Sequence, residues 1–363
     1  MTQLTAQLDH YSLFIHPNDV RELRRDIWCD DPVEAKLKMG GVRCDVQVGY
    51  RGSHIREMPK KSYRVEFETP GNRLVREIHL NAEYNDPSMI RNRLSLELFR
   101  ELGVHSPDCE HVFLTVNGSP AGVYLRLESV DEYFLRRRSL PFGSIHYAVN
   151  DDANFSLISA IDHAAKSRLD DGYERKCGDE RSDEQLRQLI YSINTIPRAE
   201  FGVQIRNWID IDKYLRWLAG VVFTQNFDGF IQNYALYCNP QTGLYEIFPW
   251  DFDATFGRDI RGEILDYDYV PIEGYNTLSA RILDVSEFRH RYRNLLECLL
   301  ESVFTPKHLN PKVLHLFECI RPYVLQDPYK RAQVQEFEQE VDTILNFIEN
   351  RRRYLCDHLE DLL

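Results

Sequence analysis

Long apolar runs are missing from this sequence. No stretch approaches the roughly 20 apolar residues that a membrane-spanning helix needs. The first residues, MTQLTAQLDHYSLF, also lack the basic start and the apolar stretch of a secretory signal. We therefore expect a protein that is made in the cytoplasm and has no membrane partner.

Closely spaced cysteines are missing as well. The chain has eight cysteines, and no two of them lie closer than fifteen residues. This spacing excludes C-x-x-C zinc knuckles and a dense disulfide framework. We expect reduced and mostly buried thiols.

Basic residues are too few to balance the acidic ones. Lys and Arg number 44 against 57 Asp and Glu, which gives a formal net charge of −13. A chain with this charge repels a nucleic-acid backbone, so we expect no nucleic-acid partner and a preference for basic or neutral partners. Apolar residues make up 43% of the chain, with 20 Tyr and 19 Phe, and this composition excludes a disordered chain.

The N-terminal part of the sequence shows the alternation of half-buried strands. Apolar residues recur at every second position in four runs, 42–50, 63–67, 112–116 and 123–127. Between the second and third runs we predict a helix with Asp86 as its N-cap and Gly103 as its stop signal. The order strand, strand, helix, strand, strand predicts an antiparallel sheet.

The rest of the chain is mainly helical in its periodicity. A charged tract from 151 to 184 predicts a solvated loop or a helical excursion. A buried helix at 209–225 leads into a hairpin at 234–248, and helical periods follow from 278 onward. The length of 363 residues indicates one large domain or two closely associated lobes. We predict an α+β fold with a β-rich N-terminal lobe and a mostly helical C-terminal lobe.

Two polar side chains after the buried helix stand at a spacing typical of kinases. Asp228 and Asn233 match the D-x-x-x-x-N of a kinase catalytic loop, in which the Asp takes the proton of the substrate hydroxyl and the Asn holds a metal. The hairpin returns the chain to Asp251, so strand pairing places Asp251 beside Asn233. Together with Phe252 and Asp253, this Asp resembles the D-F-G metal motif with a second carboxylate in place of Gly.

Oxygen ligands of this kind predict a divalent cation. Carboxylate and amide oxygens suit Mg²⁺ or Mn²⁺, and such an ion also bridges nucleotide phosphates. A single Asp in a loop is more often a turn cap, but three at kinase-like spacing favour the metal site. A glycosidase that uses two of these acids stays open, because paired carboxylates are all that it requires. The adjacent amide of Asn233 fits a metal better.

A kinase also needs a cation on the phosphates. Lys60 and Lys61 begin the strand that follows a turn with the sequence RGSH, so we weigh a phosphate role for either lysine against a solvated hairpin pair. Glu97 and Glu101 would be partners for such a lysine, or surface residues of the helix. The motifs of zinc peptidases, α/β-hydrolases and P-loop proteins are absent.

Several separated segments resemble a known family. The segments YRGSHIREMPKKSYRVEF, LNAEYNDPSMIRNRLSLELFRELG, VNGSPAGVYLRLESVDEYFL, FTQNFDGFIQNYALY and IFPWDFDATFGRD are similar to successive motifs of the spore coat protein H (CotH) kinases. The resemblance spans nearly the whole chain. It implies a single kinase-like catalytic domain over 1–363, with an N-lobe at 1–145 and a C-lobe at 146–363 that carries the catalytic hairpin.

The resemblance also implies an activity. It indicates an atypical protein kinase, made in the mother cell, that transfers phosphate from ATP to serines of other spore coat proteins and so supports coat assembly and germination. Basic, serine-rich coat proteins would be its substrates, and the spore coat its final location. A non-catalytic coat component or binding protein with the same fold is the alternative.

The family match assigns roles to individual residues. It makes Asp228 the catalytic aspartate and Asp251 the metal-binding aspartate, with Asn233 and Asp253 beside it. It implies that the nucleotide base stacks between two aromatic side chains, for which core packing is the alternative explanation. These aromatic side chains, and the cationic ones that fit the phosphates, are Tyr147, Trp250, Arg51 and Lys61.

Overall fold

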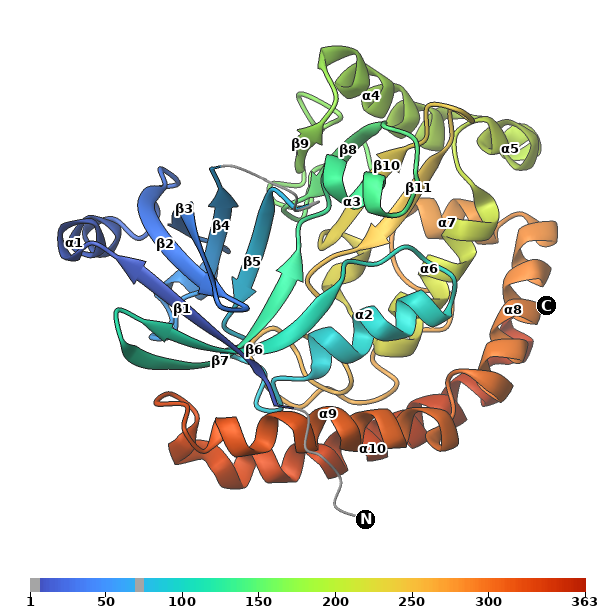
Figure 1. Ribbon diagram of the computed structural model, residues 1–363. Coiled ribbons are helices and arrows are strands. Elements are labelled where there is room, and N and C mark those ends of the chain that lie inside the picture. The colour runs from blue at the N-terminus through green and yellow to red at the C-terminus, as the bar shows by residue number, and fades with distance from the viewer. Residues whose placement is uncertain (1–6, 69–74) are drawn as a thin grey trace.

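The N-terminal part of the protein is a closed β-barrel. The computed structural model describes residues 7–68 and 75–363. Around the barrel the strands follow the order β1-β2-β3-β4-β5-β7-β6, and a parallel pairing of β1 with β6 closes it (Figure 1). The strand bounds are β1 Asp9–Ile15, β2 Val33–Met39, β3 Val42–Tyr50, β4 Tyr63–Phe67, β5 Glu77–Asn81, β6 Cys109–Val116 and β7 Ser119–Glu128. Helix α1 (Pro17–Arg25) follows β1, and a short 3-10 turn, η1 (His54–Glu57), follows β3.

The predicted antiparallel sheet is part of a closed barrel, which the sequence analysis did not predict. All four predicted strands are present as β3, β4, β6 and β7, but β1, β2 and β5 complete the ring. Strand β5, with the sequence EIHLN, alternates polar and apolar residues, but the sequence analysis did not identify it as a strand, and all five of its residues are buried. Closure through a parallel pair depends on contacts about 100 residues apart, which no local pattern shows.

The helix after β5 begins later than predicted. Helix α2 runs over Arg91–Glu101, and Ile90 occupies its N-cap position. Asp86 instead caps the turn before the helix, where its carboxylate accepts from the amides of Ser88 at 2.9 Å and Arg91 at 3.0 Å. Gly103 follows the helix with a φ of +79°, as its predicted role as stop signal requires.

The C-terminal part has a second sheet surrounded by helices. Its strand order is β11-β10-β8-β9, with all three pairings antiparallel. The strands are β8 Ser144–Ala148, β9 Tyr173–Cys177, β10 Tyr234–Cys238 and β11 Tyr245–Pro249. The helices are α3 Glu132–Arg137, α4 Glu180–Thr195, α5 Arg198–Gln204, α6 Ile211–Thr224, α7 Thr277–Leu283, α8 Ser286–Ser302, α9 Pro306–Val324 and α10 Val334–Asp357. The charged tract 151–184 is mostly loop, as predicted, but it also contributes β9 and the start of α4.

The predicted α+β fold with a β-rich N-terminal part and a mostly helical C-terminal part is confirmed. The main hydrophobic core combines Leu94 and Leu98 of α2 with Trp217 and Leu218 of α6, so it extends across the predicted lobe boundary. A lobe division at residues 145 and 146 stays a prediction. The barrel has a separate core of its own.

The last two helices connect both parts of the molecule. In Figure 1, α9 and α10 run side by side beneath the barrel and the helical part. The turn between them brings Asp327 into the barrel wall, where its carboxylate pairs with Lys60 at 2.8 Å and accepts from the Val123 amide at 3.0 Å. Lys330 donates to the Tyr84 carbonyl at 2.7 Å. Both charged side chains of the Lys60–Asp327 pair are fully buried.

The cysteine prediction is confirmed in one respect and wrong in another. All eight cysteines, which lie in the described ranges, are free. Only Cys238 among them is fully buried, and Cys298 is exposed. In the described part of the chain, no helix has the length and apolar character to cross a membrane.

Candidate functional site

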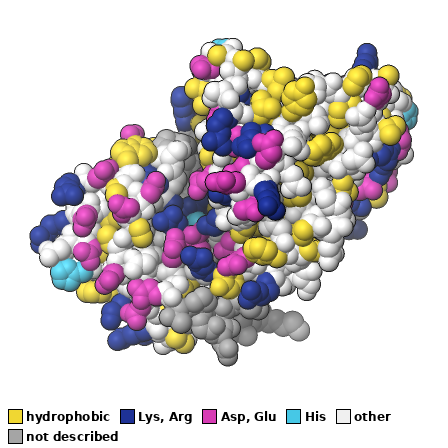
Figure 2. Space-filling view, turned by 90° about the horizontal axis from the view of Figure 1, so that it is seen from above, with side chains coloured by type: hydrophobic (Ala, Val, Ile, Leu, Met, Phe, Trp, Pro, Cys, Tyr) yellow, Lys and Arg dark blue, Asp and Glu magenta, His cyan; other side chains and the backbone are white. Residues whose placement is uncertain are grey.

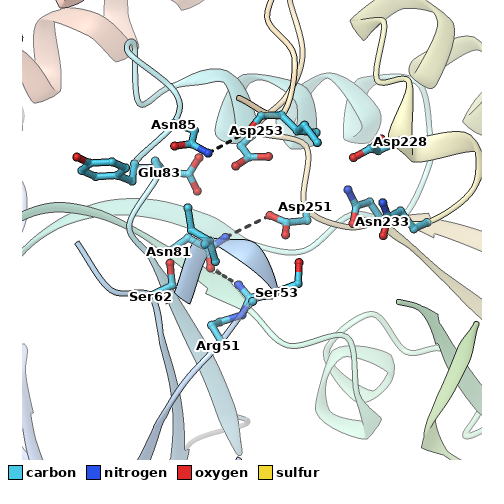
Figure 3. A pocket seen from close by; sticks show the side chains of 15 residues that line it. Arg51, Ser53, Ser62, Asn81, Glu83, Asn85, Asp228, Asn233, Asp251 and Asp253 are labelled. Carbon is cyan, nitrogen blue, oxygen red and sulfur yellow. Dashed lines mark hydrogen bonds between the residues drawn. The ribbon is translucent and has the colours of Figure 1, made fainter. Parts of the chain in front are cut away.

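A polar cavity lies where the barrel meets the helical part. Its volume is about 150 Å³. Figure 2 shows charged side chains around a hollow between the two parts, and Figure 3 shows the cavity from close by. The barrel side and the segment after β5 supply Arg51, Gly52, Ser53, Ile55, Ser62, Asn81, Glu83, Tyr84 and Asn85, and the C-terminal side supplies Asp228, Gln232, Asn233, Asp251, Asp253 and Ile260.

The turn after α6 places Asp228 at the cavity. Helix α6 ends at Thr224, and its C-cap residue Gln225 has a left-handed backbone with a φ of 56°. The side chain of Asn226 then accepts from the Gly229 amide at 3.0 Å, and Asp228 begins the short 3-10 turn η3 (Asp228–Phe230). The position of Asp228 is therefore fixed by the backbone on both sides of it.

Asn233 and Asp251 flank the two strands of the hairpin. Tyr234 of β10 lies opposite Pro249 of β11, and the Trp250 amide donates to the Asn233 carbonyl at 3.1 Å. Both residues line the cavity, as the hairpin predicts. Each has a left-handed backbone, with φ values of 60° and 58°, which is strained for residues with a side chain.

A chain of hydrogen bonds connects the barrel to Asp251. The guanidinium of Arg51 donates to the side-chain oxygen of Asn81, and the Asn81 amide donates to Asp251 Oδ1 at 3.5 Å (Figure 3). The guanidinium carbon of Arg51 also lies 5.4 Å from the ring centroid of Trp250. Arg51 was expected to contact the phosphates, and it provides a positive charge within the cavity.

Two further acids face the cavity. Burial, and then the nearby charge of Asp251, raises the pKa of Asp253 to about 8. Burial together with the charges of Asp253 and Asp251 also raises the pKa of Glu83. The side chain of Asn92 donates to Glu83 Oε1 at 3.2 Å, and it accepts from the Phe252 amide at 3.1 Å. Asn92 therefore links the segment after β5 to the segment after β11.

The donor set fits a divalent cation that shares its coordination with phosphates. Within residues 7–68 and 75–363, no three acidic, His or Cys side chains form a complete metal cage. Mg²⁺ does not need such a cage, because it keeps several waters and binds one or two carboxylates together with substrate phosphates. Asp251, Asn233 and Asp253 present oxygens to one cavity in which acidic groups outnumber cationic ones.

Neither predicted lysine lines this cavity. Lys60 is fully buried in its ion pair with Asp327, and its ammonium lies 4.6 Å from the ring centroid of Tyr124. Lys61 donates to the Arg56 carbonyl and lines a separate depression of about 320 Å³ on the barrel. Glu97 and Glu101, the possible partners of a lysine, lie on α2.

The two acids of α2 have surface partners. Glu97 pairs with Arg93 at 2.8 Å, and Glu101 pairs with Lys312 and His308. Neither acid lines the cavity. Their alternative assignment as surface helix residues agrees with this placement.

The two aromatic residues assigned to the base contact each other. The ring centroids of Tyr147 and Trp250 are 5.1 Å apart, and the rings are tilted by 39°. The Tyr147 hydroxyl donates to the Val130 carbonyl at 3.1 Å, and His79 packs edge-on against Trp250 at 5.1 Å. A base between these rings requires them to separate, so the sandwich stays a prediction.

Asn81 and Glu83 were missed by the sequence analysis. Both lie in the segment LNAEYND, within a motif that carries the family resemblance. The available signal was a polar residue at the end of a buried strand, followed by a second polar residue two positions later. Asn81 lies at the end of β5, which pairs with β4 and β7, and its side chain reaches Asp251 from there.

This arrangement defines a kinase-like protein. A β-rich part and a helical part enclose a loop that carries Asp228, and a second aspartate, Asp251, follows the hairpin. The chain belongs to the family described as CotH kinase protein, which matches residues 48–355. Membership implies a kinase that uses ATP.

Two relatives agree with this assignment. The chain is 54% identical to inner spore coat protein H of Bacillus subtilis (strain 168), with 98% of this chain and 99% of the relative covered. It is 27% identical to the inner spore coat protein H-like protein of the same organism, covering 84% and 87%.

Two solved structures are more distant. The HipA–HipB–DNA complex of Shewanella oneidensis MR-1 gives a TM-score of 0.39 at 13% identity, covering 97% of this chain and 74% of that one. The Helicobacter pylori kinase CtkA gives 0.27 at 10% identity, covering 89% and 95%. The family assignment rests on the family match and on the 54% identity to inner spore coat protein H.

Proposed function

We propose that this protein is an atypical protein kinase that transfers the γ-phosphate of ATP to serine residues of other spore coat proteins. The observation that carries the proposal is the convergence of Asp228, Asn233 and Asp251 at one cavity in a member of the CotH kinase family. Desolvating several charged groups in one place is costly, and a purely structural protein has no need to do so.

Each residue has a distinct role in the proposal. Asp228 accepts the proton of the substrate hydroxyl as that oxygen attacks the γ-phosphorus, and the bond from the γ-phosphorus to the β,γ-bridging oxygen breaks to release ADP. Asp251, Asn233 and Asp253 hold Mg²⁺ or Mn²⁺, which when bound neutralises charge on the β- and γ-phosphates. Arg51 contacts the phosphates from the barrel side.

The nucleotide base needs a place outside the polar cavity. Tyr147 and Trp250 remain the proposed stacking pair, and Arg51 connects them to the phosphates because it lies against Trp250. A nucleotide role for Lys61 also stays a prediction. It requires the ammonium group to leave the Arg56 carbonyl and turn toward the cavity.

The surface beside Asp228 supports a basic substrate. Tyr269 and Tyr275 are exposed and pack against Phe227, with ring centroids 5.6 and 5.1 Å away. The same segment, 258–275, contains exposed acids that form no ion pair with any described residue, Glu263, Asp266, Asp268 and Glu273. Acidic and aromatic side chains together attract Lys and Arg through charge and cation–π contacts.

The cellular context of the proposal follows from the relatives. Two relatives are named as inner spore coat proteins, so we propose synthesis in the mother cell, assembly into the spore coat, and a role in coat assembly and germination.

A phosphoryl-transfer assay tests the proposed function. The purified chain is incubated with γ-labelled ATP and spore coat extract, with Mg²⁺, with Mn²⁺ and with neither. Label on serine that depends on the divalent ion supports a serine kinase. Absence of label under all conditions, from a folded chain, would support the alternative of a non-catalytic coat component.

A further inference from the structure

A second cavity, on the barrel, carries the opposite charge to the first. This barrel pocket is the depression of about 320 Å³ that Lys61 lines. Arg24 of α1 and Lys61 are the two cationic side chains among its described lining residues, and no described acid lines it. The chain as a whole has a net charge of −13. A pocket whose charged groups are all cationic favours an anion, even in an acidic protein.

Neither cation of the barrel pocket is neutralised by an ion pair with a described residue. Arg24 is exposed. Lys61 donates to the Arg56 carbonyl, and its ammonium lies 5.8 Å from the ring centroid of Tyr50. Burial lowers the pKa of Lys61, and the charge of Glu57, which lies outside the pocket lining, opposes this shift. An incoming anion would therefore meet positive charge that no neighbouring carboxylate already compensates.

Tyrosine rings form walls of the barrel pocket. Tyr50 and Tyr63 lie opposite each other on β3 and β4, with ring centroids 5.7 Å apart, and the ring of Tyr124 on β7 lies 6.3 Å from that of Tyr63. The turn between α9 and α10 adds Tyr329. The first three side chains are buried. Flat aromatic walls of this kind suit a ligand with an aromatic ring.

Tyr63 brings to the pocket a hydroxyl that the described part of the protein does not use. The Tyr124 hydroxyl donates to the Lys61 carbonyl at 3.0 Å, but no described residue forms a hydrogen bond with the hydroxyl of Tyr63. Burial raises the pKa of Tyr63, so its hydroxyl keeps the proton and acts as a donor. Tyr63 is 8% exposed, and a buried donor without a partner is costly. An acceptor on a ligand would remove that cost.

Strand geometry separates the barrel pocket from the catalytic cavity. Tyr50 and Tyr63 are paired in the ladder, and the adjacent residues continue it, because the Arg51 amide donates to the Ser62 carbonyl at 3.1 Å. Successive residues of a strand face opposite sides. Tyr50 and Tyr63 therefore line the barrel pocket, whereas Arg51 and Ser62 line the catalytic cavity. The two cavities share no described lining residue.

We propose that the barrel pocket binds a small aromatic monocarboxylate, with its ring among the tyrosines and its carboxylate facing Arg24, Lys61 and the Tyr63 hydroxyl. Guanidinium, ammonium and phenol groups all donate to a carboxylate. A volume of about 320 Å³ is near the lower end for ligand pockets, so it suits a single ring better than a nucleotide. The site does not depend on the proposed kinase function. It gives Lys61 a role that needs no movement toward the catalytic cavity.

Benzoate is the probe that tests the proposal. The full chain is titrated with benzoate, and binding is followed by saturation-transfer NMR. Benzyl alcohol and benzylammonium, which carry the same ring, are the neutral and cationic comparisons. We expect saturable benzoate binding and about tenfold or more weaker binding of the other two compounds. A saturating amount of Mg²⁺ and a non-hydrolysable ATP analogue should leave the benzoate affinity unchanged.

Two variants and one control locate the bound probe. Arg24→Gln should weaken benzoate binding by about tenfold, because it removes a charged donor. Tyr63→Phe removes only the hydroxyl and should weaken binding by about threefold. It should also keep its unfolding temperature, because no described residue loses a partner. Arg25→Gln is the matched control, since Arg25 is the next exposed residue of α1 and does not line the pocket. It should bind benzoate as the wild type does.

The binding data decide the proposal whatever the transfer assay shows. Benzoate binding that is not saturable, or benzyl alcohol binding of equal strength, would overturn it. An unchanged affinity in Arg24→Gln or Tyr63→Phe, or an equal loss in Arg25→Gln, would also overturn it. Displacement of benzoate by the ATP analogue would assign the probe to the nucleotide site instead. Charge-selective binding that both variants weaken and that the control and the analogue leave intact would support the barrel site.

Discussion

At the scale of single residues, two side chains that line the cavity, Asn233 and Asp251, belong to residues with a left-handed backbone conformation. For residues other than Gly this costs on the order of 1–2 kcal/mol each, and such strain persists where the surrounding structure fixes it. Their proximity was predictable, because it follows from hairpin register alone. The contribution of Glu83 was not, because it lies outside the hairpin, in the segment between β5 and α2, where Asn92 of α2 contacts its side chain.

Trp250 provides a prediction about the nucleotide base. Its ring already contacts Tyr147, His79 and Arg51, so a base that stacks here exchanges one aromatic contact for another. Trp250→Ala should weaken nucleotide binding by tenfold or more, measured by calorimetric titration. Trp28→Ala, at an exposed position on the barrel side, is the control and should leave the affinity unchanged. Equal affinity in a folded Trp250→Ala variant would assign both rings to core packing.

His111 provides a prediction about pH. It is buried on β6, and its Nε2 donates to the Met89 carbonyl at 2.8 Å, while burial and the charge of Arg93 lower its pKa to about 3. The unfolded chain, with a His pKa near 6.5, therefore binds more protons between those values, and stability falls as the pH drops below about 6.5. Between pH 7 and pH 5 the wild type should lose on the order of 2 kcal/mol more than His111→Gln in urea unfolding. Parallel pH profiles for the two proteins would show that His111 contributes nothing.

At the scale of elements, α10 connects α2 to the segment that follows Asp253. Glu340 is 1% exposed, pairs with Arg91 of α2 at 2.5 Å and also binds Arg258 of the segment after Asp253. The periodicity of α10 predicted a helix in this part of the chain. It did not predict that one buried acid on this helix would hold two arginines from distant elements.

Glu340→Gln tests this arrangement. Removing one partner of a buried ion pair leaves an uncompensated charge, so the variant should lose about 3–5 kcal/mol in urea unfolding. The control is Glu338→Gln on the same helix, whose ion pair with Arg321 is largely exposed. That change should cost less than about 1 kcal/mol. Similar losses from the two variants would contradict a special role for Glu340.

At the scale of the whole molecule, net charge predicts how substrates approach. With a net charge of −13 and unpaired exposed acids in the segment 258–275, the protein should attract Lys- and Arg-rich serine peptides over long distances. Raising the salt to about 0.5 M shortens the screening length to a few ångströms and should lower kcat/KM for such a peptide. A neutral serine peptide is the control. An unchanged ratio between the two peptides would show that charge does not guide binding.

Composition and periodicity predicted the α+β class, but not how distant parts meet. The Lys60–Asp327 pair joins residues 267 positions apart. Lys60 was one of two lysines considered for a phosphate role, and this ion pair holds it away from the cavity. Burial lowers the pKa of Lys60 to about 8. Because only the folded chain brings Asp327 to the barrel wall, no local pattern could distinguish Lys60 from a solvated residue.

The most direct test of the central claim separates the two aspartates. Calorimetric titration with ATP and Mg²⁺ is run beside a transfer assay on folded Asp228→Asn and Asp251→Ala. The account predicts that Asp228→Asn keeps ATP and metal affinity while transfer falls by about 10²- to 10⁴-fold, the usual contribution of a positioned general base. Asp251→Ala should lose both metal-dependent ATP binding and transfer. Full transfer activity in Asp228→Asn, or undiminished metal-dependent ATP binding in Asp251→Ala, would contradict the account.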